Sequence, residues 1–312
     1  MSRYNSRSSL CATHWAARKH WLQEMRPKQH LKYSALWLYQ LATARRRSRI
    51  AQELRESGNH PVAILFYHRV ADSHPNDWTM NVRDFSLQLD WLQMHFDIVT
   101  LEEAQRRIVA PYNDRPTVAI TFDDGYADNV QTAIPELMRR NLPATYFVAT
   151  DFMRNGAAFP HDMARGVPLQ PNTIAELRQF VAAGIELGAH TKSHANLAAI
   201  DDADQLRDEI VGSAQQLERW CRVPIRYFSF PYGLPENTSQ RAVDIIRAAG
   251  FAGFCTAYNA WNWPGTEGFH LRRCHADPGL QSLKNRLTLD PRKLHDRNQL
   301  PFVESIPTQL ST

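Results

Sequence analysis

From residue 61 onward, short apolar segments alternate with segments in which apolar residues recur at helical spacing. The short apolar segments predict strands at 62–67, 97–100, 117–122, 144–149, 185–189, 227–230 and 251–256. The periodic segments predict helices at 84–94, 102–108, 127–140, 173–183, 201–219 and 238–249. This alternation indicates an α/β fold with a parallel sheet, either a distorted (β/α) barrel of about seven strands or an open doubly wound sheet.

Residues with acidic, basic or hydroxyl side chains follow several of the predicted strands. They are Asp123 and Asp124, then His190, and then Tyr232. The carboxyl ends of barrel strands face one mouth, so we expect these residues to converge, which favours the barrel over the open sheet. Neighbouring side chains on a strand point to opposite faces. The two aspartates therefore have to lie where the strand gives way to its loop, and Gly125 permits that break.

One carboxylate and two imidazoles at such a mouth suit a divalent metal ion. His190 and His194 lie four residues apart, and Asp124 can supply the carboxylate. Three protein ligands leave an open position for water, as in catalytic zinc sites. Asp123 then stays free to act as a base.

These motifs resemble the polysaccharide deacetylases with a NodB-type domain (carbohydrate esterase family 4-like). The resemblance rests on the segments Thr121-Phe122-Asp123-Asp124-Gly125, His190-Thr191-Lys192-Ser193-His194 and Phe230-Pro231-Tyr232-Gly233, and it spans roughly residues 61–275. It implies a distorted barrel, a zinc ion (or Co²⁺, Ni²⁺ or Fe²⁺) and hydrolytic removal of acetyl groups from an N-acetylated poly- or oligosaccharide.

The resemblance also assigns roles to residues. Asp124, His190 and His194 match the metal ligands, and Asp123 matches the general base. The backbone N–H of Tyr232 matches a donor to the oxyanion, and Pro231 and Gly233 belong to the same substrate-binding motif. Many relatives carry an arginine in place of Ser229, where it steadies the base.

Because that arginine is missing, we expect Arg272 or Arg273 to orient Asp123. We also expect Thr191 to brace its loop by hydrogen bonding, and Asp128 and Asn129 to cap the helix that follows.

Two histidines compete for the role of general acid. His68, in Leu65-Phe66-Tyr67-His68, resembles a motif that is permuted to the N-terminal side in bacterial poly-N-acetylglucosamine deacetylases, and it follows the first predicted strand. His275 is the late candidate. We prefer His68 because of its motif and its place at a strand end.

Two tryptophans, Trp261 and Trp263, follow the last predicted strand. They suit stacking against a sugar ring, and they equally suit packing over the barrel.

Charge separates the N-terminal segment from the rest of the chain. Residues 1–60 hold 12 Lys and Arg against 3 Glu, a net charge of +9, and the remainder carries −5, which together give the +4 of the whole chain. We expect a basic helical extension at 1–60, a barrel at 61–290 and a tail at 291–312. The extension, with a helix over 31–55, suits either packing against the barrel or peripheral contact with an anionic membrane. No nucleic-acid motif accompanies the charge.

Four scattered cysteines without a CxxC pair argue against a disulfide framework. No secretory signal and no run of 18 apolar residues is evident. The sequence therefore predicts a protein of the cytoplasm or of the inner membrane face. Its sugar polymer and its oligomeric state stay undetermined.

Three other functions remain open. Another C–N hydrolase of allantoinase or imidase type would use the same metal geometry in a narrower pocket. A non-catalytic glycan-binding protein would not need a metal-activated water. A deacetylase of a lipid-linked precursor would suit the basic extension.

Overall fold

The computed structural model describes residues 27–292. The first part of the basic extension and most of the expected tail lie outside these residues. The division at residues 60 and 290 stays a prediction.

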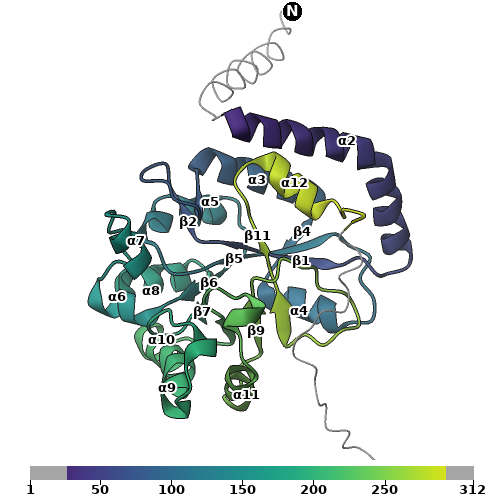
Figure 1. Ribbon diagram of the computed structural model, residues 1–312. Helices are drawn as coiled ribbons and strands as arrows, with labels where there is room; N and C mark the ends of the chain where they lie inside the picture. Colours follow the sequence, from purple (N-terminus) through teal and green to yellow (C-terminus); the bar gives the residue numbers. More distant parts are fainter. Residues whose placement is uncertain (1–26, 293–312) are drawn as a thin grey trace, which may run out of the picture.

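The core is a nine-stranded, parallel sheet that curls into a distorted (β/α) barrel, as the sequence predicts (Figure 1). Its strands are β1 (Val62–Tyr67), β4 (Asp97–Val99), β5 (Thr117–Phe122), β6 (Thr145–Val148), β7 (Glu186–Ala189), β8 (Tyr227–Ser229), β9 (Gly253–Thr256), β10 (His270–Arg272) and β11 (Cys274–His275). The spatial order is β10-β9-β8-β7-β6-β5-β1-β11, and β4 pairs with β5 off this path. A separate ribbon pairs β2 (Arg69–Val70) with β3 (Thr79–Met80).

The barrel is closed by one extended segment, residues 270–275, which the sequence analysis did not predict as a strand. Its first half, β10, pairs with β9, and its second half, β11, pairs with β1. Arg273 lies between the two halves, and its backbone N–H donates to the Thr256 carbonyl at 3.0 Å. The side chain of Arg273 is thereby fixed at the seam of the barrel.

A small apolar cluster fills the barrel interior. Strand residues such as Val62, Ala119 and Leu271 pack there against Leu101 and Ile108 of helix α4 (Leu101–Val109). Tyr227, at the start of β8, donates a hydrogen bond from its hydroxyl to Gln105 of α4 at 2.7 Å. Helix α4 therefore closes the amino-terminal end of the barrel, and the carboxyl ends of the strands stay free for chemistry.

Helices cover the outside of the barrel (Figure 1). They are α3 (Val82–His95), α5 (Ala133–Arg139), α6 (Thr150–Asn155), α7 (Pro160–Ala164), α8 (Ile174–Ala182), α9 (Ala203–Arg207), α10 (Ser213–Cys221), α11 (Gln240–Ala248) and α12 (Leu280–Leu287). Side-chain caps fix several helix starts, because they satisfy backbone N–H groups that a first turn leaves free. Asn81 and Thr100 begin α3 and α4, and Thr173 forms a capping box with Glu176 at α8.

Two helix predictions were only partly right. The segment predicted at 127–140 is a 3₁₀ turn (Ala127–Val130) followed by α5. Asp128 and Asn129 do not cap α5, so that prediction was wrong. Asp128 instead accepts two hydrogen bonds from Arg69, at 2.7 and 2.9 Å, and Asn129 accepts from the backbone N–H of Val70. Both side chains thus reach the segment that follows β1.

The predicted helix 201–219 is continuous from α9 to α10 but contains one π turn, Asp208–Gly212. A π turn closes its hydrogen bonds over five residues rather than four, so it widens the helix locally, and such turns are frequent at functional sites.

The basic extension forms a long helix, α2 (Pro27–Glu56), that lies against α12 (Figure 1). Arg47 attaches it, because its buried guanidinium donates to the Asn285 carbonyl at 3.0 Å and to the Asn285 side chain at 2.7 Å. Tyr39 adds a 2.7 Å hydrogen bond to Asp290. Among residues 27–292, no helix combines the length and the apolar character needed to cross a bilayer.

Candidate active site

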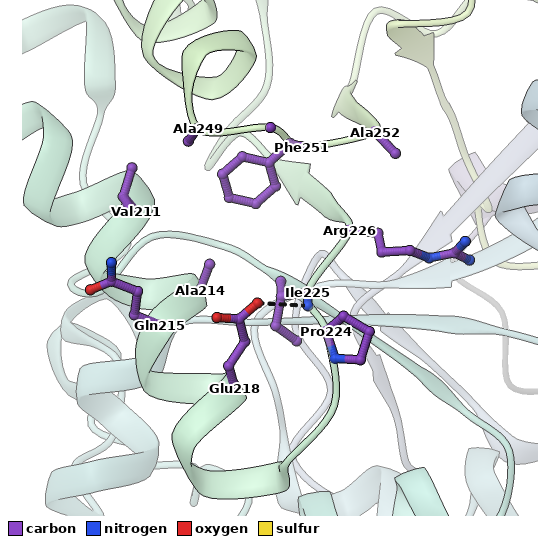
Figure 2. A pocket seen from close by; sticks show the side chains of 11 residues that line it. Val211, Ala214, Gln215, Glu218, Pro224, Ile225, Arg226, Ala249, Phe251 and Ala252 are labelled. Carbon is purple, nitrogen blue, oxygen red and sulfur yellow. Dashed lines mark hydrogen bonds between the residues drawn. The ribbon is translucent and has the colours of Figure 1, made fainter.

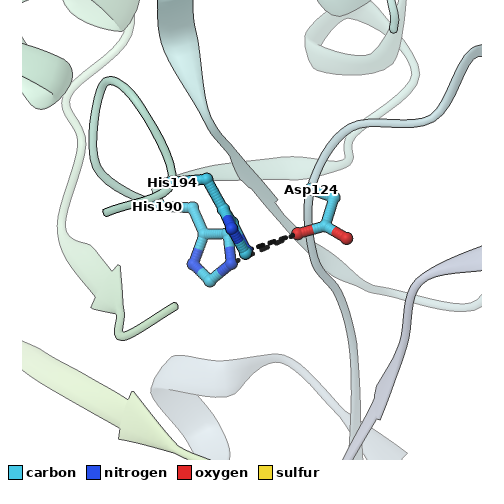
Figure 3. Close-up of side chains that lie close together, drawn as sticks. All are labelled: Asp124, His190 and His194. Atoms are coloured by element: carbon cyan, nitrogen blue, oxygen red, sulfur yellow. Dashed lines mark ion pairs between the residues drawn. The ribbon is translucent and has the colours of Figure 1, made fainter. Parts of the chain in front are cut away.

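Asp124, His190 and His194 meet at the carboxyl ends of the strands (Figure 3). The Asp124 Oδ1 atom lies 3.4 Å from Nε2 of His190 and 3.2 Å from Nε2 of His194. The three ligand atoms lie within 4.8 Å of one another, and the aspartate and His190 are buried. The three residues that the sequence analysis assigned as metal ligands are therefore brought together.

The backbone turns sharply where these side chains leave the sheet. Asp124 and His194 adopt left-handed φ values of +74° and +58°, which cost energy for residues with a Cβ atom. Gly125, with φ of +103°, continues the break after β5. A Cβ atom there would approach the Met153 Cε atom to 2.9 Å. Asp123 and Asp124 can consequently face the same mouth although they are neighbours in sequence.

His190 is oriented by the neighbouring strand. Its Nδ1 atom lies 2.8 Å from the Ser229 backbone carbonyl. A carbonyl oxygen only accepts, so the proton sits on Nδ1 and the Nε2 lone pair is directed toward Asp124. This arrangement is the usual support of a metal-binding imidazole.

These residues fit a divalent cation. Among the described residues, Asp124 Oδ1 is a buried carboxylate oxygen with no hydrogen-bond donor. A charged oxygen without a donor is costly in the interior, and a cation beside it removes that cost. One carboxylate with two imidazoles is a donor set that suits zinc and also Co²⁺, Ni²⁺ or Fe²⁺.

Asp123 is held by Arg273 in a buried two-point contact. The guanidinium Nη1 and Nη2 atoms donate to the two carboxylate oxygens at 2.7 Å each. Arg273 also donates to the Ser229 hydroxyl at 2.8 Å. Of the two arginines expected to orient Asp123, Arg273 is the one that contacts it. Ser229, at the position where the resemblance implies an arginine in many relatives, thus contacts an arginine of the closing segment.

The same contact keeps Asp123 ionised. Burial by itself would raise the pKa of Asp123, but the Arg273 guanidinium and the His190 imidazole outweigh it, and the pKa lies below its usual value. An ionised carboxylate beside the metal position can accept a proton from water.

The two candidate acids lie on the same side of the mouth. Their ring centroids are 6.1 Å apart, and both rings contact Phe66 edge-on. His68 lines the pocket that the three metal residues also line, called the central pocket below. Its Nδ1 atom has no hydrogen-bond partner among residues 27–292. Burial lowers the pKa of His68 to about 4, although the Asp124 and Asp123 carboxylates act in the opposite direction. His275 instead has a carboxylate partner, Asp277, at 2.8 Å.

Tyr232 lines the same pocket and has a left-handed φ of +61°. The residue is 57% exposed, and its ring contacts His194 edge-on. In the described part of the chain, its backbone N–H donates to no protein group. Gly233 also has a positive φ, of +63°, and a Cβ atom there would come within 2.8 Å of the Ala257 backbone nitrogen. Pro231 and Gly233 are buried in this turn, so they hold Tyr232 in place rather than border the pocket.

A family model described as "Polysaccharide deacetylase" matches residues 110–254. The match includes the aspartate pair, both histidines and Tyr232. The chain contains a polysaccharide deacetylase domain.

Curated relatives of the deacetylase domain are distant. The chain is 24% identical over 185 residues to the "Putative polysaccharide deacetylase YxkH" of Bacillus subtilis, which covers 58% of this chain and 60% of that protein. It is 26% identical over 191 residues to a "Peptidoglycan-N-acetylglucosamine deacetylase" of Bacillus cereus, with 59% of this chain and 74% of that protein covered. The match thus spans less than two thirds of the Bacillus subtilis relative's length.

The fold of the deacetylase domain is shared with solved structures. A Streptococcus pyogenes deacetylase, PplD, superposes with a TM-score of 0.63 at 20% identity, over 74% of this chain and 99% of that one.

The central pocket of the deacetylase domain has a volume of about 200 Å³. Besides the metal residues, Asp123, Arg273, His68 and Tyr232, it is lined by Phe66, Trp78, His161, Phe230 and Ala257. The sequence analysis missed Trp78 and His161. Neither lies in a recognised motif, and only the packing of the β2–β3 ribbon and α7 brings them to the mouth.

Trp261 and Trp263, expected as sugar-stacking residues or as packing residues, are buried in the main apolar core. Neither lines the central pocket. Of the two interpretations, packing is therefore the one that the structure supports.

A second hollow of about 400 Å³ lies outside the barrel of the deacetylase domain (Figure 2). It is bordered by α10 and by the segments that lead into β8 and β9, at the opposite end of these strands from the metal residues. Its charged groups already have partners in the protein, because Glu218 accepts from the Ile225 N–H and Arg226 pairs with Glu102 and Glu186. It takes no part in the chemistry at the mouth.

Proposed function

We propose that this chain hydrolyses N-acetyl groups of an acetylated amino-sugar polymer or oligomer, with a bound zinc ion as cofactor. One observation carries the proposal: a three-ligand metal site shares a mouth with an arginine-held carboxylate. A non-catalytic glycan-binding module would need neither the cation nor the ionised base.

In this reaction a bound divalent ion supplies Lewis acidity toward the acetamide carbonyl and lowers the pKa of water. Asp123 takes the proton of the attacking water, whose oxygen bonds to the carbonyl carbon. The backbone N–H of Tyr232 donates to the carbonyl oxygen as negative charge develops there. The C–N bond then breaks, the sugar amine takes a proton from a histidine imidazolium, and acetate leaves. The proton held by Asp123 passes to solvent, from which the imidazole is protonated again.

We propose His68 as the imidazole that protonates the amine. It borders the pocket, whereas His275 does not. The low pKa of His68 keeps its ring neutral in the resting protein. To donate a proton, His68 has to become an imidazolium. Negative charge that builds beside the ring during the reaction favours this protonated form over the neutral one. The position at the pocket favours His68 as the acid, whereas the carboxylate partner Asp277 favours His275.

The substrate class that we propose is a poly-N-acetylglucosamine-type glycan. The support is the segment Leu65-Phe66-Tyr67-His68 at the end of β1, which resembles that branch of deacetylases. Because β11 and β1 are neighbours, a motif moved from the last strand to the first returns to the same place in the barrel.

The deciding experiment measures acetate released from chitin oligomers, poly-N-acetylglucosamine and peptidoglycan fragments, together with metal content. We expect release from at least one glycan and one divalent ion per chain. Protein that holds no metal and releases no acetate would overturn the proposal. Turnover of hydantoin- or allantoin-type amides without any glycan activity would instead favour the alternative C–N hydrolase.

We further propose that α2 contacts an anionic membrane surface, which places the protein peripherally at the inner face. Trp37, Leu41, Arg45 and Arg49 recur every four residues and so share one side of the helix. All are exposed, Trp37 by 52% and Leu41 by 61%. Aromatic and aliphatic residues beside arginines suit the headgroup region of anionic lipids.

A vesicle sedimentation assay tests this surface. The full chain should bind vesicles that contain phosphatidylglycerol better than neutral phosphatidylcholine vesicles. The double variant Trp37→Ser, Leu41→Ser should lose this binding, and Met138→Ser, which replaces an exposed apolar residue on α5, should retain it. Equal binding by both variants would contradict the proposal.

A further inference from the structure

The loop between the two metal histidines has an unfavourable backbone conformation. Thr191 and His194 both adopt left-handed φ values, of +64° and +58°. Residues with a Cβ atom stay in this region only where their surroundings fix them. The Thr191 side chain, expected to brace the loop, does not do so, because its buried hydroxyl has no hydrogen-bond partner among residues 27–292. The bracing must come from elsewhere.

Glu209 holds this loop from the neighbouring helix. One of its carboxylate oxygens, Oε2, accepts the backbone N–H groups of Lys192 at 2.9 Å and Ser193 at 3.0 Å. The other, Oε1, accepts the Ser193 hydroxyl at 2.6 Å. The side chain is buried, with the residue only 8% exposed. Hydrogen bonds from N–H groups to an ionised carboxylate are roughly twice as strong as neutral ones.

The segment that carries Glu209 is the π turn between α9 and α10. Its neighbour Asp208 also reaches the loop, but only through an exposed ion pair with the Lys192 Nζ atom at 2.7 Å. One turn of helix thus makes two kinds of contact with the loop. One fixes the backbone from a buried position, and the other joins two side chains at the surface.

We propose that Glu209 is a positioning residue for the metal site. It holds residues 190–194 in the conformation that directs both Nε2 atoms at one cation, and so it sets the affinity for zinc. This inference rests on the proposed metal-dependent function and extends it to a residue outside the mouth. Without the carboxylate, two backbone N–H groups lose their acceptor, and the loop can relax away from its left-handed conformation.

The test compares zinc dissociation constants, measured by competition with a chromophoric chelator. Glu209→Ala should bind zinc about 10- to 100-fold more weakly than the unaltered chain, as is usual when a residue that supports a metal ligand is lost. Glu209→Gln keeps an acceptor for both N–H groups and should recover most of the affinity. Asp208→Asn, the matched control on the same turn, should bind as the unaltered chain does, because its ion pair is exposed.

Thermal melts with and without zinc separate positioning from a general structural role. A merely structural residue would lower the melting temperature equally in both conditions. A positioning residue also shrinks the stabilisation that zinc provides, because that stabilisation follows the affinity. Should Glu209→Ala fail to fold, Ser193→Ala removes one of the three contacts and should still weaken zinc binding by about 2- to 5-fold, in line with the loss of one hydrogen bond.

Two failures would be distinguishable. If the unaltered chain binds zinc and Glu209→Ala binds it equally well, this inference is wrong and the proposed function stands. If the unaltered chain binds no divalent metal, the proposed function fails and this inference fails with it.

Discussion

At the scale of single residues, two adjacent aspartates have different surroundings, which suit them to different tasks. Asp124 faces two imidazoles and has an oxygen without a donor, whereas both oxygens of Asp123 accept from Arg273. The first suits a cation, and the second suits a base that stays ionised. The sequence motif predicted this division of roles, which stays a prediction until metal content and turnover are measured. It could not choose between Arg272 and Arg273, because the choice depends on which side of the closing segment faces the barrel interior.

Asp123→Asn should separate metal binding from turnover. The amide keeps the shape of the side chain but cannot accept the proton of water, so we expect kcat to fall by about 10²- to 10⁴-fold. Metal content, measured on the purified protein, should stay near one ion per chain. His190→Ala serves as the contrast, because it should lose the metal itself. An active Asp123→Asn variant would exclude Asp123 as the base.

His68→Ala and His275→Ala decide between the two candidate acids. If His68 protonates the leaving amine, its loss should lower kcat by about 10²-fold or more, and His275→Ala should keep a near-normal rate. Acetate release under saturating substrate is the measurement. The reverse pattern would assign the role to His275 with its Asp277 partner.

At the scale of elements, the site depends on turns that follow strands rather than on the strands themselves. Periodicity predicted seven of the nine strands of the sheet, but it missed β10 and β11, which are only three and two residues long. It also assigned Asp128 and Asn129 to a helix cap, since cap residues and residues that bond a distant loop have the same chemistry. Glu209 looked like any acidic residue in a helix, because its function depends on a loop that precedes it by 16 residues.

Gly233→Ala should damage the turn that presents Tyr232. A Cβ atom at this left-handed position would meet the Ala257 backbone at 2.8 Å, so the turn must shift and the N–H must move with it. We expect at least a tenfold loss in kcat, as when an oxyanion donor is displaced. Gly166→Ala is the control, because φ there is +73° but the added Cβ atom meets nothing within 4 Å. Equal rates for the two variants would contradict a role for the turn.

At the scale of the whole molecule, burial of neutral imidazoles makes stability depend on pH. His60, at the junction of α2 and β1, is buried with Nδ1 3.1 Å from the Pro61 carbonyl, and burial lowers its pKa to about 4. Above pH 6.5 the ring is neutral in both the folded and the unfolded chain. As pH falls from 6.5 to 4, only the unfolded chain takes up the proton, so the free energy of unfolding decreases.

Replacement of His60 by glutamine should remove this part of the pH dependence. Between pH 7 and pH 4, the unaltered chain should lose about 3 kcal/mol more unfolding free energy than His60→Gln does. Urea unfolding of the metal-free proteins at both pH values gives the two differences. Identical losses would show that the imidazole does not resist protonation in the folded state.

The segment that closes the barrel is also among the last parts of the domain to leave the ribosome. Arg273 follows its carboxylate partner by 150 residues. A nascent or truncated chain that ends before residue 270 can already contain both metal histidines, yet it lacks the guanidinium that holds the base. The base can therefore be held in place only after synthesis has passed residue 273, and proteolytic fragments without the closing segment should be inert toward acetylated glycans.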